Sequence, residues 1–168
     1  MIFICVGSRE YQFNRLLKEL DYLVEKKHIT EEIYAQIGQS SYLPKNFKYE
    51  RFLSEEKFKN YQSNADLIIS HGGTGALIGA LKLNKQVIAV PRLAKFGEHI
   101  DDHQLQVAGV LAKEGYLSCV LDMKELLENI NSMKETVITK KYKKPSQVLN
   151  VIENFISEME VTNRSNKK

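Results

Sequence analysis

The stretch Ser70–Arg92, SHGGTGALIGALKLNKQVIAVPR, decides how this chain is organised. It continues the apolar run 65–70, places three glycines within four residues, and then shows an apolar helix-like segment and a second apolar run that ends in proline. A strand, a turn, a helix and a strand in this order predict a βαβ unit with parallel strands. Glycines before a helix permit a tight turn, and they also let an anion approach backbone N–H groups. The stretch is therefore either a simple turn or an anion site.

The same alternation continues on both sides of this stretch. Strand-like apolar runs lie at 2–6, 32–38, 48–53, 65–70, 86–91 and 116–122. Segments with the apolar spacing of a helix lie at 13–24, 54–64, 76–84, 102–112 and 123–133. Ser54 has the position and residue type of an N-cap for the second helix, and 48–53 is expected to be an edge strand. We predict an α/β fold, with a Rossmann-like, mostly parallel sheet covered by helices on both faces.

Composition limits the classes of protein that need to be considered. The 168 residues predict one domain over 1–160, including a C-terminal helix at about 145–160, followed by a polar tail at 161–168. A net charge of +3 does not indicate a nucleic-acid partner, and no run of eighteen apolar residues predicts a membrane span. Cys5 and Cys119 both lie in apolar runs, which favours free thiols in a reducing compartment and a cytoplasmic location.

Two glycine-containing turns follow strands at the edge where ligands bind in such sheets. In the first, Gly7 permits a tight turn and Ser8 is expected to cap the next helix; a plain turn remains the alternative. In the second, Gly72, Gly73 and Gly75 surround Thr74, which is also expected to act as a cap, and a phosphate cradle is favoured over a turn. The P-loop lysine is missing from this second turn. His71 either bonds a ligand or packs against the strand end.

A polar cluster follows the strand at 86–91, on the same expected edge. It consists of Glu98, His99, Asp101, Asp102, His103 and Gln104. Carboxylates, imidazoles and an amide together supply the donors and acceptors that sugar hydroxyls need, and this reading is favoured. A metal site built on His99 and His103, and an exposed loop in which Asp101 or Asp102 caps a helix, are the alternatives.

The motif HGGTGALIGALKLNKQVIAVPR followed by GEHIDDHQ resembles the nucleotide-sugar-binding half of GT-B glycosyltransferases, the C-terminal domain of glycosyltransferase family 28. It is similar to the soluble subunit of the two-piece N-acetylglucosaminyltransferase of lipid-linked oligosaccharide synthesis. It resembles still more the PssE-like proteins of capsular and exopolysaccharide synthesis. The resemblance spans about 1–122 and implies a UDP-sugar as substrate, with neither a cofactor nor a metal in the donor site.

The resemblance also implies roles for individual residues. The donor diphosphate would lie against Gly7, Ser8, Gly72, Gly73, Thr74 and Gly75. Gln36 and Gly38 would lie near the uridine, and the sugar would contact Asp102, His103 and Gln104. Gly79 departs from the pattern, because many relatives carry at this position a glutamate that often bonds the ribose.

A GT-B enzyme has two such domains, and the chain length fits one. The resemblance therefore implies a membrane-attached partner that binds a lipid-linked saccharide acceptor and usually supplies the catalytic base, which would recruit the chain to the inner face of the membrane. Glu98 and His99 are the weak candidates for acid–base chemistry here, and the basic segment 139–144 is either a solvated loop or a membrane contact.

The preferred expectation is transfer of a hexose, galactose first, from a UDP-sugar in capsular or exopolysaccharide synthesis. One alternative is a UDP-N-acetylglucosamine transferase subunit of lipid-linked oligosaccharide synthesis. A non-catalytic nucleotide-binding regulatory module is another.

Overall fold

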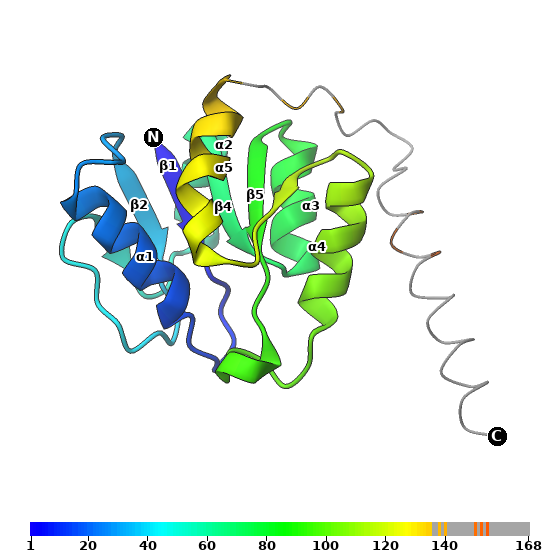
Figure 1. The fold of residues 1–168 in the computed structure, drawn as a ribbon, viewed down its shortest axis with the longest axis horizontal. Helices are drawn as coiled ribbons and strands as arrows, with labels where there is room; N and C mark the ends of the chain where they lie inside the picture. Colours follow the sequence, from blue (N-terminus) through cyan, green and yellow to red (C-terminus); the bar gives the residue numbers. More distant parts are fainter. Residues whose placement is uncertain (136–137, 139, 141–149, 151, 153, 155–168) are drawn as a thin grey trace.

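The computed structural model describes residues 1–135 together with 138, 140, 150, 152 and 154 (Figure 1). Apart from the last three of these positions, the expected helix at 145–160 and the tail at 161–168 lie outside the described residues. The basic segment 139–144 does so too, except for Lys140, whose Nζ lies 3.3 Å from Glu114 Oε2. Within the described part, no helix is long and apolar enough to cross a membrane.

Six parallel strands form one sheet in the order β3-β2-β1-β4-β5-β6. Their bounds are β1 (Ile2–Cys5), β2 (Ile33–Gln36), β3 (Lys48–Glu50), β4 (Leu67–His71), β5 (Gln86–Val90) and β6 (Ser118–Cys119). All six predicted strands are present, and β3 is the edge strand that was expected. The chain builds outward from β1 in one direction and from β4 in the other. The topological switch point therefore lies between β1 and β4.

Five helices cross between or follow these strands. They are α1 (Asn14–Glu25), α2 (Glu55–Asn64), α3 (Thr74–Lys82), α4 (His103–Lys113) and α5 (Leu126–Glu135), with short 3₁₀ turns η1 (Ala94–Phe96) and η2 (Met123–Glu125). The side chain of Ser54 accepts a hydrogen bond from the Lys57 N–H, which confirms it as the cap of α2. The predicted Rossmann-like α/β fold is confirmed.

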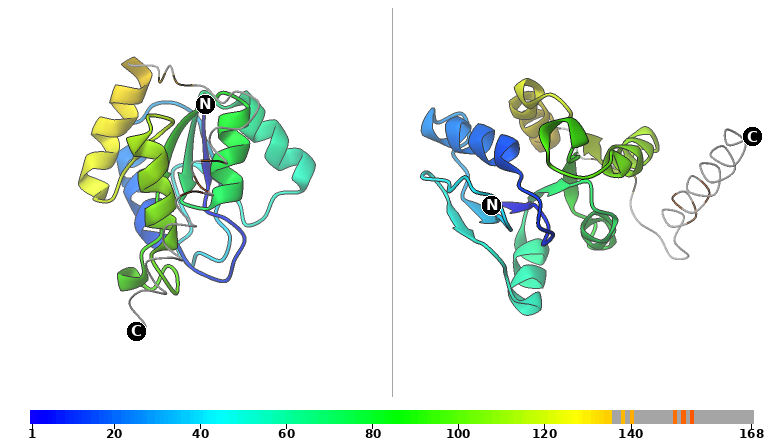
Figure 2. Two further views of the ribbon diagram at one scale, coloured as in Figure 1. Left: turned by 90° about the vertical axis from the view of Figure 1, so that its right-hand side faces the viewer. Right: turned by 90° about the horizontal axis from the view of Figure 1, so that it is seen from below.

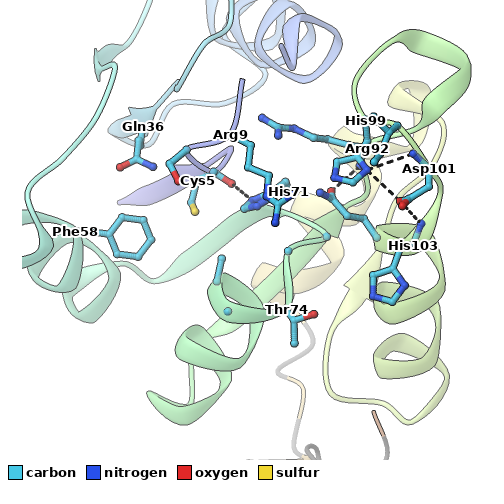
Figure 3. Close-up of a pocket in the computed structure, with 18 residues that line it drawn as sticks. Cys5, Arg9, Gln36, Phe58, His71, Thr74, Arg92, His99, Asp101 and His103 are labelled. Atoms are coloured by element: carbon cyan, nitrogen blue, oxygen red, sulfur yellow. Dashed lines mark hydrogen bonds and ion pairs between the residues drawn. The ribbon is translucent and has the colours of Figure 1, made fainter. Parts of the chain in front are cut away.

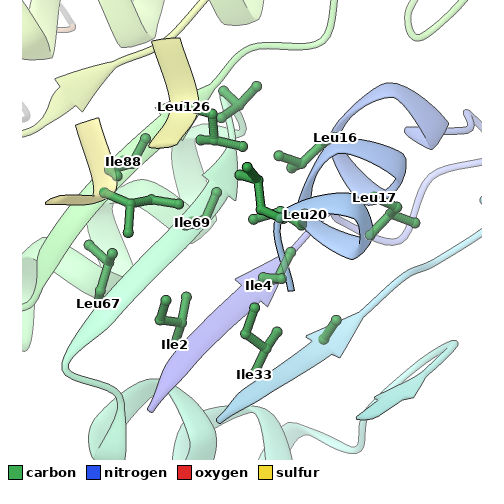
Figure 4. Close-up of a cluster of buried hydrophobic side chains, with 14 of the residues drawn as sticks. Ile2, Ile4, Leu16, Leu17, Leu20, Ile33, Leu67, Ile69, Ile88 and Leu126 are labelled. Atoms are coloured by element: carbon green, nitrogen blue, oxygen red, sulfur yellow. The ribbon is translucent and has the colours of Figure 1, made fainter. Parts of the chain in front are cut away.

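Two apolar layers cover the sheet, one on each face. Alternate residues of a strand point to opposite faces, so Ile2 and Ile4 pack toward α1 and α5 while Phe3 and Cys5 pack toward α3 and α4. Figure 4 shows leucines of α1 above β1, and Figure 2 shows α1 and α5 on the face opposite α2 and α3. Because both faces are buried, β1 reads as a continuous apolar run. Cys5 is a buried free thiol as predicted, whereas the free thiol of Cys119 is half-buried.

The strand register brings three loops to one edge of the sheet. Cys5 pairs with Ser70 across β1 and β4, and His71 pairs with Val90 across β4 and β5. The loops that follow β1, β4 and β5 therefore begin side by side at the switch point, where an open α/β sheet binds its ligands.

Candidate functional site

A cavity of about 600 Å³ opens at this edge of the sheet (Figure 3). Its walls include residues that follow β1, β4 and β5, together with Gln36 from β2 and Phe58 from α2. Of the residues predicted from the sequence, it brings together Gly7, Ser8, Gln36, His71, Gly72, Gly73, Thr74, Gly75, His99, Asp101, His103 and Gln104. A cavity of this volume is typical of a small-molecule site.

The N-terminus of α3 faces this cavity without a cap. Gly73 is the N-cap residue and offers no side chain, and Thr74 is the first helical residue, so the expected hydroxyl cap is not formed. In the part of the chain that the structure describes, the backbone N–H groups of Thr74 and Gly75 have no acceptor. Unpaired N–H groups at the positive end of a helix form an anion-binding site.

The loop after β1 is built differently from the prediction. Ser8 does not cap α1, because the helix begins only at Asn14. Six loop residues, 8–13, separate Gly7 from the helix. The Phe13 N–H donates to Ser40 Oγ at 3.0 Å, and the Asn14 N–H donates to Gln12 Oε1 at 2.7 Å. The N–H group of the first helical residue is thus paired within the protein, and no residue of α1 lines the cavity.

The ring of His71 separates the two glycine turns. Gly7 has a φ of +83°, and a Cβ atom built there would lie 2.6 Å from His71 Nε2. A Cβ atom on Gly73 would collide with the same nitrogen even more severely. Glycine is therefore required at both positions because the imidazole fills the space between them, whatever the ligand. Of the two alternatives for His71, packing at the strand end is observed; the ring also lines the cavity, and a bond from it to a ligand stays a prediction.

His71 is neutral at physiological pH. Burial, and after it the nearby positive charge of Arg92, lower the pKa of His71 from 6.5 to about 4. Its Nδ1 lies 3.1 Å from the Cys5 carbonyl oxygen, which can only accept, so Nδ1 carries the proton and donates. Nε2 is left as an acceptor between Gly7 and Gly73.

The other two glycines of the turn differ from each other. A Cβ atom on Gly72 would lie 2.7 Å from the Gln104 backbone oxygen, so Gly72 permits α4 to approach β4 closely. Around Gly75 there is no protein atom within 4 Å of such a Cβ, and the residue is exposed at the cavity. Within this turn, the protein's own packing explains why Gly72 and Gly73 have no side chain, but it leaves room for one at Gly75.

Glu98 is a structural residue rather than the acid–base candidate considered from the sequence. Its carboxylate is fully buried, and it does not line the cavity. Oε1 accepts from Arg15 Nε and Oε2 from Arg15 Nη2, each at 3.0 Å, and Oε2 also accepts from the Leu93 N–H. This bidentate pair ties the loop after β5 to α1, so the carboxylate is not available to a substrate.

The two aspartates before α4 have separate tasks. Asp102 occupies the N-cap position of α4, but its side chain makes no cap bond. The first helical N–H, that of His103, donates instead to Asp101 Oδ1 at 3.0 Å, and this oxygen also lies 3.0 Å from His99 Nδ1. Asp102 Oδ1 accepts instead from the Ala94 N–H, and Asp102 lines a different pocket, beside η1. Its expected sugar contact therefore does not follow from this geometry. Among the described residues, no three His, Cys, Asp or Glu side chains are grouped to hold a metal.

Gln104 and Gln36 each use one amide oxygen to hold the protein together. Gln104 Oε1 accepts from the Arg92 N–H, and Gln36 Oε1 accepts from the Leu53 N–H, both at 3.1 Å. Both residues also line the cavity, so their amide nitrogens are candidate hydrogen-bond donors to a ligand. Gly38 does not line it; with a φ of +54° it packs against the Gly7 carbonyl, where a Cβ would lie 2.7 Å from the oxygen.

The polar residues of the cavity are distributed along its length. Figure 3 shows Gln36 and Phe58 at one end, His71 and Thr74 in the middle, and His99, Asp101 and His103 at the other end. The uncapped start of α3 thus lies between an end with a flat aromatic ring and an end rich in polar groups. A nucleotide-sugar has the same order of parts, with its diphosphate in the middle.

Gly79, the position that departs from the family pattern, lies away from the cavity. A Cβ atom there would lie 3.4 Å from Gln62 Nε2 of α2, so this side of α3 packs against a neighbouring helix. The sequence reasoning missed Arg92, Arg9, Phe58 and Cys5 as cavity residues. Phe58 was interpreted only as an apolar helix residue, and Arg92 was considered only as the end of a strand. Phe58 cannot be told from an ordinary core residue in the sequence, whereas Arg9 beside Ser8 and Arg92 at the end of a strand are charged residues at the expected ligand edge, which was the available signal.

Comparison with known proteins agrees with this geometry. The family model described as "Glycosyltransferase family 28 C-terminal domain" matches residues 1–165. The "UDP-N-acetylglucosamine transferase subunit ALG13" of Candida albicans is 32% identical over 100 residues, which cover 59% of this chain and 32% of the relative. This chain therefore spans about a third of the length of that relative.

Solved structures share the fold. The solution structure of ALG13 superposes with a TM-score of 0.57 at 17% identity, covering 83% of this chain and 87% of that one. The glycosyltransferase SnogD from Streptomyces nogalater gives a TM-score of 0.54 at 17% identity, covering 95% of this chain and 39% of that one. The fold described here thus corresponds to most of the solved ALG13 chain and to one part of the longer SnogD chain.

Proposed function

This chain belongs to the glycosyltransferase family 28 C-terminal domain family, and on that premise we propose that it is the donor-binding subunit of a transferase that uses UDP-N-acetylglucosamine. The observation that carries the proposal is the uncapped N-terminus of α3, which faces a cavity of about 600 Å³ at the switch point of the sheet. The diphosphate would bind at Thr74 and Gly75. The uridine would lie toward Gln36 and Phe58, and the sugar toward His103 and Gln104.

The sugar is proposed from the relatives rather than from the cavity. The expected capsular or exopolysaccharide role and the preference for galactose receive no support from the matched relatives, whose names specify UDP-N-acetylglucosamine. We therefore propose N-acetylglucosamine in place of galactose, and the discrimination among UDP-sugars is the part of the proposal to be measured.

The reaction divides between two proteins. As the bond between the anomeric carbon and the β-phosphate oxygen breaks, its electron pair stays on the diphosphate, and an acceptor hydroxyl oxygen bonds the anomeric carbon and loses its proton. This chain would bind the donor and stabilise the charge that builds on the diphosphate through fixed N–H groups. A membrane-attached partner would hold the lipid-linked acceptor and supply the base, and it would bring this chain from the cytoplasm to the membrane surface.

Calorimetry with UDP, UDP-N-acetylglucosamine and UDP-galactose tests the proposal. We expect UDP to bind, and UDP-N-acetylglucosamine to bind more tightly than UDP-galactose. If UDP and both sugars fail to bind, with or without a co-expressed partner, the donor-binding function is wrong. Binding of UDP with no contribution from any sugar would instead favour a nucleotide-binding regulatory module, and a preference for UDP-galactose would restore the earlier expectation for the sugar.

A further inference from the structure

Arg92 is the largest fully buried side chain in the described residues, with 1% of its surface exposed. It follows Pro91 at the end of β5 and lines the cavity beside Cys5 and His71. Its Nη2 donates to the Tyr11 carbonyl oxygen at 3.0 Å, and its guanidinium carbon lies 5.6 Å from the centre of the Phe13 ring. These contacts hold a charged group out of water by means of neutral partners only.

One donor of this guanidinium has no partner at all. In the part of the chain that the structure describes, Arg92 Nε is the one buried side-chain nitrogen or oxygen that lacks a hydrogen bond. A buried donor without an acceptor costs roughly 1–3 kcal/mol, and more when the group is charged. Such an exception in a native protein calls for an explanation, and an incoming ligand is one.

The neighbouring ionisable groups do not neutralise Arg92. Glu98 is close enough to favour the charged guanidinium, but both of its oxygens are bonded to Arg15, and no ion pair joins Glu98 to Arg92. Burial raises the pKa of the Cys5 thiol to about 11, so Cys5 is neutral, and His71 is neutral as well. Glu98 therefore pairs with Arg15 and not with Arg92. Among the described residues, the positive charge of Arg92 stays without an ion pair beside the cavity.

We propose that Arg92 is the internal counter-charge for the donor diphosphate, acting together with the N-terminus of α3. The inference rests on the proposed function, and it gives a binding role to Arg92, the last residue of the quoted motif, to which the sequence analysis assigned none. Arg92 and the start of α3 follow β5 and β4, whose paired residues Val90 and His71 are adjacent, so both can act on one ligand. A fixed positive charge in a site shielded from water stabilises an anion much more than an exposed charge does.

Titrations of uridine and UDP into Arg92→Gln and Arg92→Lys test this inference. Because uridine has no phosphate, the ratio of its dissociation constant to that of UDP isolates the contribution of the diphosphate. We expect Arg92→Gln to lower this ratio at least tenfold, and Arg92→Lys, which keeps the charge, to lower it by less than threefold. A purely structural role would weaken uridine and UDP equally and leave the ratio unchanged, which would overturn the inference.

Arg51→Gln is the matched control. Arg51 Nη1 also donates to backbone carbonyl oxygens, those of Gly38 and Ser40, but Arg51 is exposed and does not line the cavity. Its ratio should match that of the unchanged protein. Should Arg92→Gln fail to fold, Arg92→Met takes its place in the same titrations; if no neutral variant folds, Arg92 serves the fold and the inference is wrong. If the unchanged protein binds no UDP, the proposed function fails instead.

Discussion

The loop after β1 and the turn after β4 look alike in sequence but differ in the structure. Both contain glycine, both follow a buried parallel strand, and both precede a helix at the switch point. After β4 the helix begins at once and the unpaired N–H groups of Thr74 and Gly75 line the cavity, whereas after β1 the helix begins later, its first N–H group is bonded by Gln12, and no residue of α1 lines the cavity. An anion site at a helix start thus depends on what the rest of the fold leaves unpaired, and glycine alone does not produce it.

Adding the same negative charge to each loop should break the symmetry most clearly. Gly75→Asp places a carboxylate where no protein atom lies within 4 Å, at the start of α3, so the fold should be retained and even slightly stabilised. The carboxylate would occupy and repel the diphosphate position, and we expect UDP affinity measured by calorimetry to fall at least a hundredfold, or about 3 kcal/mol.

Ser8→Asp is the partner experiment, because Ser8 is exposed at the same cavity in the loop after β1. We expect its effect on UDP affinity to be under tenfold, and Gly75→Ala should bind UDP nearly as well as the unchanged protein. If Ser8→Asp lowered UDP affinity as much as Gly75→Asp does, the two loops would contribute equally to UDP binding, and the start of α3 would not be the main site of the diphosphate.

The space between the two loops gives the next largest effect. Gly73→Ala drives a methyl group into His71 Nε2, and overpacking of this kind should lower the free energy of unfolding by about 3 kcal/mol in urea titrations. The double variant Gly73→Ala, His71→Ser replaces the imidazole by a smaller side chain. Its loss in free energy of unfolding should be smaller than the sum of the losses in the two single variants. Strict additivity of the two changes would show that the ring does not limit position 73. For this reason Gly73 is unsuited to testing ligand binding, whereas Gly75 is suited to it.

The pH dependence of stability reports on the same ring. The pKa of His71 is about 4 in the folded protein and 6.5 when unfolded, so the unfolded state binds more protons between these values. Its contribution is fully present above pH 6.5 and is lost as the pH falls toward 4, by about 3 kcal/mol.

His71→Gln lacks this titration, and urea titrations at pH 7 and pH 4 supply the comparison. The stability of the unchanged protein relative to the variant should drop by that amount, while losses from other groups, such as Asp21 with its lowered pKa, cancel between the two. An identical pH profile for the two proteins would place the ring in water.

The buried hydrogen bond just before α1 should give the smallest effect and sharpen the contrast. Ser40→Ala removes the acceptor of the Phe13 N–H in a fully buried position, which should cost about 1 kcal/mol in thermal or urea unfolding. UDP affinity should stay within twofold, since the start of α1 does not bind the ligand. A clear loss of UDP affinity with intact stability would contradict this assignment.

Much of the fold could be predicted because its signals are local. These signals act within a few residues: the apolar run of β1, the apolar spacing of α2 with its Ser54 cap, and the proline after β5. All six strands were predicted. The candidate site was predicted less completely. Cavity residues such as His71 and Gln104 lie in recognisable motifs, whereas Phe58 resembles a core residue and the burial of Arg92 at the cavity becomes visible only in the fold.

The sequence by itself determined the parallel α/β order, because alternating burial and helix periodicity follow from the spacing of side chains. It also determined where the loops gather, since parallel strands end at one edge. Only the tertiary structure decided that the N–H groups at the start of α3 stay unpaired, that Glu98 pairs with Arg15, and that Arg92 has no carboxylate partner among the described residues. Ser40 lies 27 residues from Phe13, and Arg15 lies 83 residues from Glu98. Pairing over such separations depends on packing in three dimensions, and the sequence alone therefore does not show which groups packing leaves unpaired.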